Sequence, residues 1–470
     1  MKRIAGHISR TATAAAIALG LSAPAAAQET PEHMRALVAG YKAAFTCSAT
    51  FNAGRSPESI AALELNRIYP GYREILAELP AAKIDRARKM VSVSYSEQMP
   101  PRVSAWRPHL GCAQLPIGAE ADVAAELPRV TLAAVPQGND KPWPLGDKAK
   151  PASAADLAEI IARAFDGKTY GAGTETSAVV VSRSSELLGE RYRAGYDLHT
   201  SQRTWSVAKS IAATVVGIAV GDGVLKLDEP APVPEWQSPL DPRRGITLAN
   251  LLHMSSGLYS GQSGSRTDQI YAGGARITDR ATEAPLDALP GSRWRYANND
   301  TLLAVRSLRA SLGSDADYLR YPFEKLLHRI GMRDTLLETD WEGNFVMSSQ
   351  VWTTARDLAR LGILYLNDGV WAGERVLPAD WVDYVRTPAP QQPPALNSRG
   401  EPGWGYGAQW WLLGERFQLP KDGFMAAGHR GQYVFVVPSL DLVIVRRGYD
   451  ESGGQQFDIA AFARDIIAAL

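Results

Sequence analysis

The chain has 470 residues, of which 45% are hydrophobic and 21% are charged, so it can bury a substantial core and is not globally disordered. Its 50 basic and 50 acidic side chains cancel, and no basic block interrupts the sequence, so a nucleic-acid partner has no electrostatic support and we expect none. The length allows two or three domains, or one large domain beside a small one.

The N-terminus has the order of a secretory signal peptide. Three basic residues precede an apolar stretch of about eleven residues, and small residues follow up to an Ala-x-Ala site that ends at Ala27. The apolar stretch is too short to cross a bilayer as a permanent helix, and Gln28 rather than a cysteine follows the expected cleavage point. We therefore expect residues 1–27 to be removed, and the mature protein to be periplasmic or secreted without a permanent membrane anchor.

Residues 28–135 predict a small N-terminal α+β domain. A helical pattern covers residues 31–45, and alternating runs at 89–95 and 102–106 flank a Pro-containing connection, which indicates a β-hairpin. Residues 136–154 are dense in proline, glycine and charge, and we expect them to form the linker to the next domain.

Both cysteines of the chain, Cys47 and Cys112, lie in this N-terminal domain. In an exported chain, two cysteines are more often a disulfide than a catalytic pair, so we predict a Cys47–Cys112 disulfide. Two buried free thiols are the alternative.

Residues 155–470 predict a second, larger domain. A helical pattern at 154–165 opens it, and an amphipathic helix at 456–470 closes it. The region from about 200 to 400 has the pattern of helices and loops, and strand-like runs lie on either side of it, at residues 177–183, 187–196, 406–414, 431–439 and 441–448. We expect the early and late strands to pair in one antiparallel sheet, with the mostly helical region inserted beside it and the active cleft between the two.

Ser206 and Lys209 stand three residues apart at the start of the apolar run "IAATVVGIAVG". Residues at i and i+3 share one face of a helix, and a lysine at the start of a buried helix is costly unless it is paired or has a lowered pKa. A serine hydroxyl needs a base within hydrogen-bond reach to act as a nucleophile. The alternative, that Ser206 only caps the helix, leaves Lys209 unexplained.

Tyr-x-Asn occurs twice. Tyr365 belongs to an amphipathic helix and is most simply a packing residue, whereas Tyr296 and Asn298 lie in the short polar and aromatic segment "GSRWRYANND", where functional side chains tend to be displayed. Trp410 and Trp411 alternate along an expected strand, so at most one of them should face the cleft.

His-x-Gly also occurs twice. The triplet that begins at His109 abuts Cys112 and is expected to be structural. The triplet His429-Arg430-Gly431 is expected to open a strand, where Gly431 would let a substrate backbone approach closely.

The order Ser206-x-x-Lys209, Tyr296-x-Asn298, His429-x-Gly431 resembles the serine β-lactamase-related family. That family includes class C β-lactamases, D-alanyl-D-alanine peptidases, certain esterases and 6-aminohexanoate-dimer hydrolases, and the segment "GHRGQ" is most similar to the last branch. The resemblance covers roughly residues 155 to 470. It implies an α+β, β-lactamase/transpeptidase-like fold, with an antiparallel sheet flanked by helices, and no cofactor or metal.

The same resemblance implies a role for each motif residue. Ser206 would be the nucleophile, Lys209 its proton acceptor or electrostatic activator, and Tyr296 the carrier of the proton to the leaving group. Asn298 would bond a substrate carbonyl and help to hold Lys209. The backbone N–H groups of Ser206 and Gln432 would form the oxyanion hole, with His429 and Gly431 beside the substrate. Whether Lys209 or Tyr296 is the base stays open.

One departure bears on the substrate. Penicillin-recognising members commonly carry Lys-Thr-Gly where this chain has His429-Arg430-Gly431, and a histidine is mostly neutral near pH 7. We therefore expect an esterase or amidase acting on a small molecule or short peptide. A β-lactamase or D-alanyl-D-alanine carboxypeptidase is one alternative, and a non-catalytic peptide-binding relative is another. Gly-x-Ser-x-Gly and His-Glu-x-x-His, which would indicate other hydrolase classes, do not occur.

Overall fold

The computed structural model describes residues 30–134, 140–149, 155–260, 267–397 and 400–470. The expected signal peptide, residues 1–27, and part of the expected linker at 136–154 lie outside the described residues. Among the helices in these ranges, none is both long enough and apolar enough to span a membrane.

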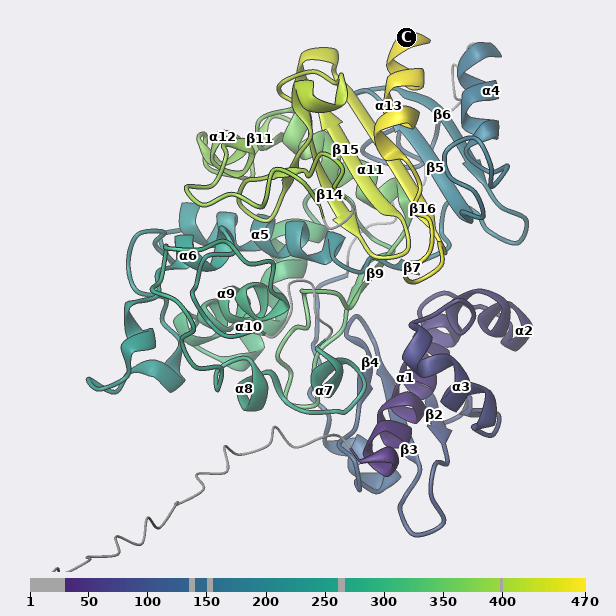
Figure 1. Ribbon diagram of the computed structural model, residues 1–470, viewed down its shortest axis with the longest axis vertical. Coiled ribbons are helices and arrows are strands. Elements are labelled where there is room, and N and C mark those ends of the chain that lie inside the picture. Colours follow the sequence, from purple (N-terminus) through teal and green to yellow (C-terminus); the bar gives the residue numbers. More distant parts are fainter. Residues whose placement is uncertain (1–29, 135–139, 150–154, 261–266, 398–399) are drawn as a thin grey trace, which may run out of the picture.

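The N-terminal part, at the lower right of Figure 1, packs a long helix on a four-stranded antiparallel sheet in the order β1-β2-β3-β4. The long helix begins with Pro31 after the capping side chain of Thr30, which accepts from the backbone of His33. The sequence-predicted hairpin is confirmed as β2–β3. The elements are α1 (Pro31–Phe51), α2 (Pro57–Ser59), α3 (Pro70–Glu78), β1 (Lys83–Asp85), β2 (Met90–Val93), β3 (Arg102–Arg107) and β4 (Gly111–Gln114).

Cys47 in α1 and Cys112 in β4 form a disulfide, which is the pairing that the sequence predicts. The bond ties the long helix to the last strand of the sheet across 65 positions of sequence. Constraining so long a loop in the unfolded chain favours the folded state, by about 2–4 kcal/mol for a typical disulfide.

The larger part contains a seven-stranded antiparallel sheet in the order β12-β13-β14-β15-β16-β5-β6. Early strand β5 pairs with late strand β16, so the predicted pairing of early and late strands is confirmed (Figure 1). The strands are β5 (Thr176–Ser182), β6 (Leu187–Tyr192), β12 (Gly405–Tyr406), β13 (Trp411–Leu412), β14 (Phe424–Gly428), β15 (Gln432–Val437) and β16 (Leu442–Gly448).

Both faces of this sheet are covered by helices, which explains why its central strands β5, β15 and β16 are buried at every position. Val180 and Val443 belong to the core that α5 and α11 share, whereas Val179 and Ile444 point the other way, into the core with α4 and α13. The helices are α4 (Ala155–Arg163), α5 (Val207–Gly221), α11 (Ala355–Leu366) and α13 (Ile459–Ala468).

The middle of the chain forms the predicted helical region beside the sheet. Helix α5 separates the two, because it contacts β14 and β15 as well as α9, and residues 207–219 of this helix are buried (Figure 1). The other elements are α6 (Leu248–Leu252), α7 (Asp268–Tyr271), α8 (Ile277–Arg280), α9 (Asn298–Ser311), α10 (Asp315–Pro322), α12 (Trp381–Arg386), β7 (Gln202–Arg203), β8 (Leu336–Leu337), β9 (Val351–Thr353), β10 (Val370–Trp371) and β11 (Glu374–Arg375).

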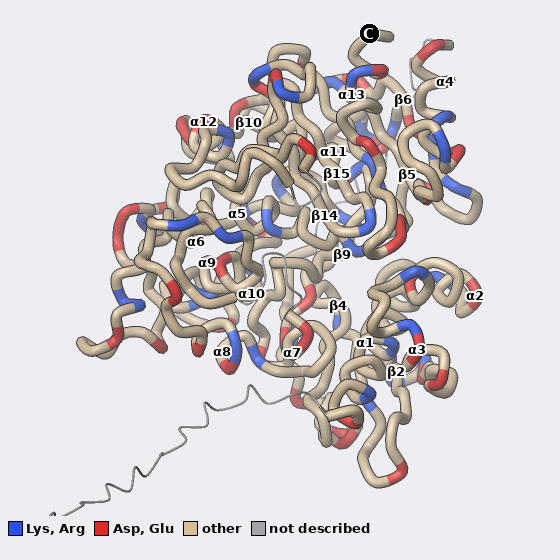
Figure 2. The backbone as a smooth tube through the Cα atoms, in the orientation of Figure 1, with Lys and Arg blue, Asp and Glu red and all other residues tan. Residues whose placement is uncertain are grey.

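The N-terminal part packs directly on the larger part. A Cβ added to Gly40 in α1 would lie 2.0 Å from the Ala272 carbonyl oxygen, so the two backbones touch there. Arg102, 1% exposed, donates to the carbonyl oxygens of Ala272 and Gly273. The division into domains at residues 135 and 155 stays a prediction. Basic and acidic residues are interspersed over the described chain (Figure 2).

Candidate active site

Ser206 stands at the N-cap position of α5, directly after the two-residue strand β7 and a short turn. The residue before it, Trp205, has a left-handed backbone with φ of +51°, which is uncommon for a residue with a side chain. The Ser206 hydroxyl makes no capping hydrogen bond to the helix. Instead it is directed toward Lys209, so Ser206 does not act as an ordinary helix cap.

The Lys209 amino group is the centre of the site. Its nitrogen lies 3.0 Å from Ser206 Oγ, and it donates to Asn298 Oδ1 at 2.7 Å and to the Ser348 carbonyl oxygen at 2.8 Å. Lys209 is 1% exposed, and burial lowers its pKa from 10.5 to about 7. A substantial fraction of this amine is therefore neutral near pH 7 and able to accept a proton.

Tyr296 approaches from the segment that precedes α9. Lys209 Nζ lies 5.0 Å from the centroid of its ring. Burial raises the pKa of the phenol above its ordinary value, more than the hydrogen bond with Ser206 lowers it. The phenol therefore keeps its proton near neutral pH and can donate it.

Aromatic side chains pack around the ring of Tyr296. Trp411 stacks on its ring with the centroids 5.4 Å apart, and Tyr406 meets the ring edge-on. Trp410 instead points into the core and packs on Tyr365. The expectation that at most one of the two tryptophans faces the site is confirmed.

The segment His429-Arg430-Gly431 differs from the sequence prediction. It does not open a strand but forms the turn between β14 and β15, with φ of +60° at Arg430 and +76° at Gly431, and β15 begins one residue later. The end of β14 lies against the backbone of Ser206. A Cβ added to Gly428 would come within 3.1 Å of the Ser206 nitrogen.

Gly431 and Gln432 lie on the buried side of this turn. A Cβ on Gly431 would collide with the Arg446 guanidinium, so a side chain is excluded here by a neighbouring arginine, and no substrate is needed to explain the glycine. The Gln432 amide is fully buried and donates to the carbonyl oxygens of Arg430 and Gly448. A role for the Gln432 backbone N–H in an oxyanion hole stays a prediction.

The carbonyl that holds Lys209 and a buried acid in the first turn of α9 are missed by the sequence analysis. The carbonyl of Ser348 holds Lys209, and the Ser348 hydroxyl lies 2.5 Å from the hydroxyl of Tyr271. Asp300, in the first turn of α9, accepts from the Ser256 hydroxyl at 2.8 Å, and burial raises its pKa to about 7. Asp300 stands two residues after Asn298 in "YANND", so its place in the segment was a usable signal, whereas a backbone carbonyl leaves none.

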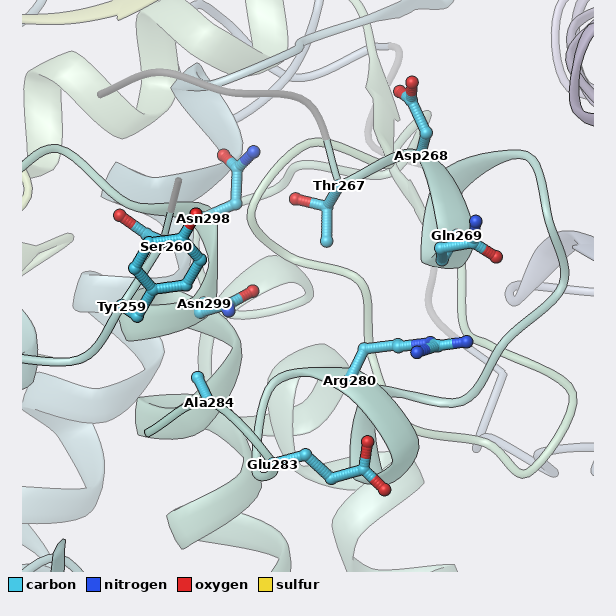
Figure 3. A pocket seen from close by; sticks show the side chains of 10 residues that line it. All are labelled: Tyr259, Ser260, Thr267, Asp268, Gln269, Arg280, Glu283, Ala284, Asn298 and Asn299. Carbon is cyan, nitrogen blue, oxygen red and sulfur yellow. The ribbon is translucent and has the colours of Figure 1, made fainter. Parts of the chain in front are cut away.

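A cavity of about 390 Å³ opens beside Asn298 (Figure 3). Asn298 and Tyr259 lie on one side of it and Arg280 and Gln269 on the other. The Gly/Ser-rich segment 261–266 lies outside the described residues. The full lining is Tyr259, Ser260, Thr267, Asp268, Gln269, Arg280, Glu283, Ala284, Asn298 and Asn299.

A sequence profile of the β-lactamase family matches residues 160–447, which is more than half of the chain. The chain belongs to the β-lactamase family. Its site therefore belongs to a hydrolase of the serine β-lactamase type.

Proteins that resemble this chain in sequence or structure carry the names of different hydrolases. The 6-aminohexanoate-dimer hydrolase of Paenarthrobacter ureafaciens is 29% identical over 294 residues, which cover 58% of this chain and 72% of that protein. A candidate 6-aminohexanoate-dimer hydrolase from Bacillus anthracis has a similar structure, with a TM-score of 0.55 and 21% identity over 72% of this chain and 90% of that one. A family VIII carboxylesterase gives a TM-score of 0.53 and 15% identity over 69% of this chain and 100% of that one. The two structural likenesses show the fold of the β-lactamase family.

The lowered pKa of Lys209 predicts how the hydrolase responds to pH. If the neutral amine is the base, the competent fraction grows as pH rises, so kcat/KM should increase through about pH 7 and level off above it. The measurement is the initial rate with p-nitrophenyl butyrate from pH 5 to 9, corrected for spontaneous hydrolysis. A profile that is flat or falls over this range would contradict the assignment.

Proposed function

We propose that this chain is an exported serine hydrolase that cleaves an ester or amide bond through an acyl-enzyme on Ser206. The proposal rests above all on one contact, the 3.0 Å between Ser206 Oγ and the buried Lys209 amine. Export is proposed from the N-terminal sequence and fits the Cys47–Cys112 disulfide.

In the proposed acylation, Ser206 Oγ attacks the carbonyl carbon of the substrate while its proton passes to Lys209 Nζ. The tetrahedral intermediate carries a negative oxygen. We propose that the Ser206 N–H at the start of α5 binds this oxygen together with an N–H of the β14–β15 hairpin, which the resemblance to the β-lactamase family implies to be that of Gln432. When the C–O or C–N bond breaks, Tyr296 donates its proton to the leaving group and is reprotonated from Lys209.

Deacylation follows the same route with water. Water attacks the acyl carbon, its proton passes to the basic group, and the bond to Ser206 Oγ breaks as the oxygen regains a proton. The products are the free acid and the original enzyme. The pKa directions favour Lys209 over Tyr296 as the starting base, because burial favours the neutral form of both groups and only the neutral lysine can accept a proton.

Two observations support, as the substrate class, an ester or amide that carries no carboxylate next to the scissile bond. The relative from Paenarthrobacter ureafaciens hydrolyses the 6-aminohexanoate dimer by name, and its 29% identity covers 58% of this chain. The second observation is His429, which replaces the lysine of penicillin-recognising relatives. Without that cation, a substrate carboxylate loses a charge-assisted hydrogen bond of about 1.5–3 kcal/mol, which is roughly ten- to a hundred-fold in kcat/KM.

We therefore expect the enzyme to prefer p-nitrophenyl butyrate or the linear 6-aminohexanoate dimer over a chromogenic cephalosporin. The measurement is kcat/KM for the three substrates at pH 7.5, in the wild type and in His429→Lys. Because the exchange also removes the ring that stacks on Tyr69, it should lower kcat for all three substrates, and the diagnostic result is a rise in the ratio of kcat/KM for the cephalosporin to kcat/KM for the ester. A wild type that already prefers the cephalosporin would favour the β-lactamase alternative, and no turnover of any substrate together with no fluorophosphonate labelling would favour a binding protein.

A further inference from the structure

The residue before the proposed nucleophile packs on the N-terminal part of the chain. The Trp205 ring lies 5.6 Å from that of Phe45 in α1 and meets Tyr69 edge-on at 6.2 Å. Trp205 is 6% exposed and has a left-handed backbone. Such a conformation persists only where the surroundings fix it, and here two of the fixing rings lie outside the residues that match the β-lactamase family.

The turn beside the nucleophile is held from the same side. The His429 ring stacks on Tyr69, with centroids 5.1 Å apart and planes 13° from parallel, and meets Trp205 edge-on at 5.0 Å. His429 Nε2 lies 2.8 Å from the Ser452 hydroxyl. The Tyr69 ring therefore contacts both Trp205, which precedes Ser206, and His429, which belongs to the β14–β15 turn.

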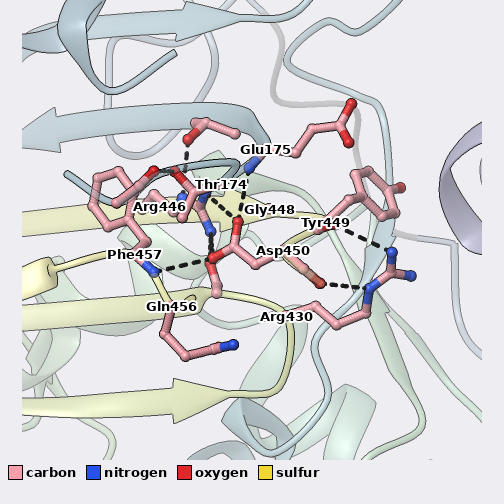
Figure 4. Close-up of polar contacts among 12 residues, drawn as sticks. Thr174, Glu175, Arg430, Arg446, Gly448, Tyr449, Asp450, Gln456 and Phe457 are labelled. Atoms are coloured by element: carbon pink, nitrogen blue, oxygen red, sulfur yellow. Dashed lines mark hydrogen bonds and ion pairs between the residues drawn. The ribbon is translucent and has the colours of Figure 1, made fainter. Parts of the chain in front are cut away.

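Arg430 anchors the turn to the N-terminal backbone. Its guanidinium donates to the carbonyl oxygens of Asn66 at 2.8 Å and Glu64 at 3.4 Å, and on the other side to those of Asp450 and Tyr449. Arg430 is 2% exposed, and its backbone is left-handed. Figure 4 shows the guanidinium reaching Tyr449 and Asp450 from the turn.

From these contacts we propose that the N-terminal part completes the active site, with Tyr69 as a positioning residue for Trp205 and His429 and with Arg430 as the anchor of the turn. This inference rests on the proposed function. Tyr69 does not need to touch the substrate. It acts by holding the backbone on both sides of the Ser206 hydroxyl, and small displacements of a nucleophile have large effects on rate.

The test compares Tyr69→Ala and Tyr69→Phe in the full-length enzyme. With p-nitrophenyl butyrate at 25 °C, Tyr69→Ala should lower kcat by about 10- to 100-fold and change KM far less, because the nucleophile is misplaced rather than the substrate site lost. Tyr69→Phe keeps the stacked ring, so its kcat should stay within about three-fold of the wild-type value. The rate of fluorophosphonate labelling, which reports acylation alone, should follow kcat.

Trp106→Ala is the matched control. Trp106 is a half-buried ring of the same N-terminal sheet that donates to Asn52 and lies under Lys89. Its loss should lower the melting temperature at least as much as Tyr69→Ala while leaving kcat within about three-fold. Should Tyr69→Ala fail to fold, Tyr69→Leu retains the apolar volume without the ring face and should show the same fall in kcat.

Arg430→Gln tests the second contact independently. It should lower kcat by about ten-fold or more, whereas Arg67→Gln, which removes partly exposed ion pairs with Glu175 and Glu451 across the same interface, should not. Wild-type kcat in folded Tyr69→Ala and Tyr69→Leu would overturn the inference. If Ser206→Ala is inactive in the same assay, the proposed function survives that result, whereas an active Ser206→Ala would refute the proposed function itself.

Discussion

Ser206→Ala should reduce kcat by about 10³- to 10⁶-fold and abolish fluorophosphonate labelling, while the melting temperature changes little. The alanine removes only the oxygen that would form the acyl bond. Because this hydroxyl makes no capping hydrogen bond to α5, its loss leaves the helix start intact. The readouts are kcat with p-nitrophenyl butyrate and the mass of the protein after incubation with the probe, which should increase in the wild type alone.

Lys209→Ala and Tyr296→Phe should each cost orders of magnitude in kcat as well. The double and triple variants should then be hardly worse than Ser206→Ala alone, since the three groups act as one unit. Lys209→Arg should not rescue, because arginine stays protonated. Ser210→Ala is the matched control: this buried serine on the same helix donates to the Gln409 carbonyl oxygen and should affect stability rather than kcat. Wild-type turnover in Ser206→Ala would refute the acyl-enzyme.

Arg446→Met should destabilise the protein by about 3–5 kcal/mol, because it leaves a buried carboxylate without its partner. Arg446 and Asp450 are both 0% exposed and form two hydrogen bonds of 2.9 and 2.7 Å (Figure 4). Arg446 also donates to the Gly431 carbonyl oxygen at 2.8 Å, and Asp450 accepts from the backbone of Glu175 at 2.9 Å. The pair therefore joins β16, the β14–β15 turn and the start of β5.

The measurement is the free energy of unfolding in urea, followed by tryptophan fluorescence. Lys226→Met, which breaks an ion pair whose partners are 67% and 61% exposed, is the control and should cost less than about 1 kcal/mol. The double variant Arg446→Met/Asp450→Leu should recover part of the loss, because both buried charges are then gone. An Arg446→Met protein as stable as the control variant would show that the pair contributes little.

The centre of the site could be predicted from the sequence because its residues sit in local patterns. Ser206 and Lys209 share a helical face by spacing alone, and the buried helix made an unpaired lysine costly. Tyr296 and Asn298 were distinguished from the other Tyr-x-Asn pair by their polar, aromatic surroundings. The structure brings all four together around the Lys209 amine. The pairing of β5 with β16 could be predicted because strand-like apolar runs lie on both sides of the helical region and are most simply placed in one sheet.

Other parts of the site depend on contacts that no local pattern encodes. The Ser348 carbonyl holds Lys209 at 2.8 Å, and any residue could have supplied that oxygen. Tyr69 reaches His429 from 360 positions away through a ring contact that leaves no periodic trace. The sequence suggests that the glycine at 431 gives a substrate access, whereas the Arg446 guanidinium occupies the space beside it. The apolar residues that follow the triplet containing this glycine predict that it opens a strand, but the left-handed backbones of Arg430 and Gly431 turn the chain before the strand begins.

The pairing of β5 with β16 also sets the order in which the enzyme can be built. Ser182 and Val443 are neighbours in the middle of the sheet, yet the ribosome makes the first long before the second. Until the last strand is made, β5 and β15 each present an open edge, so a nascent chain cannot complete the sheet on which its own nucleophile depends. A product truncated before residue 442 would expose two central edges, and such edges invite aggregation. Incomplete copies of this hydrolase are therefore expected to be cleared or to aggregate rather than to persist as partly active enzyme.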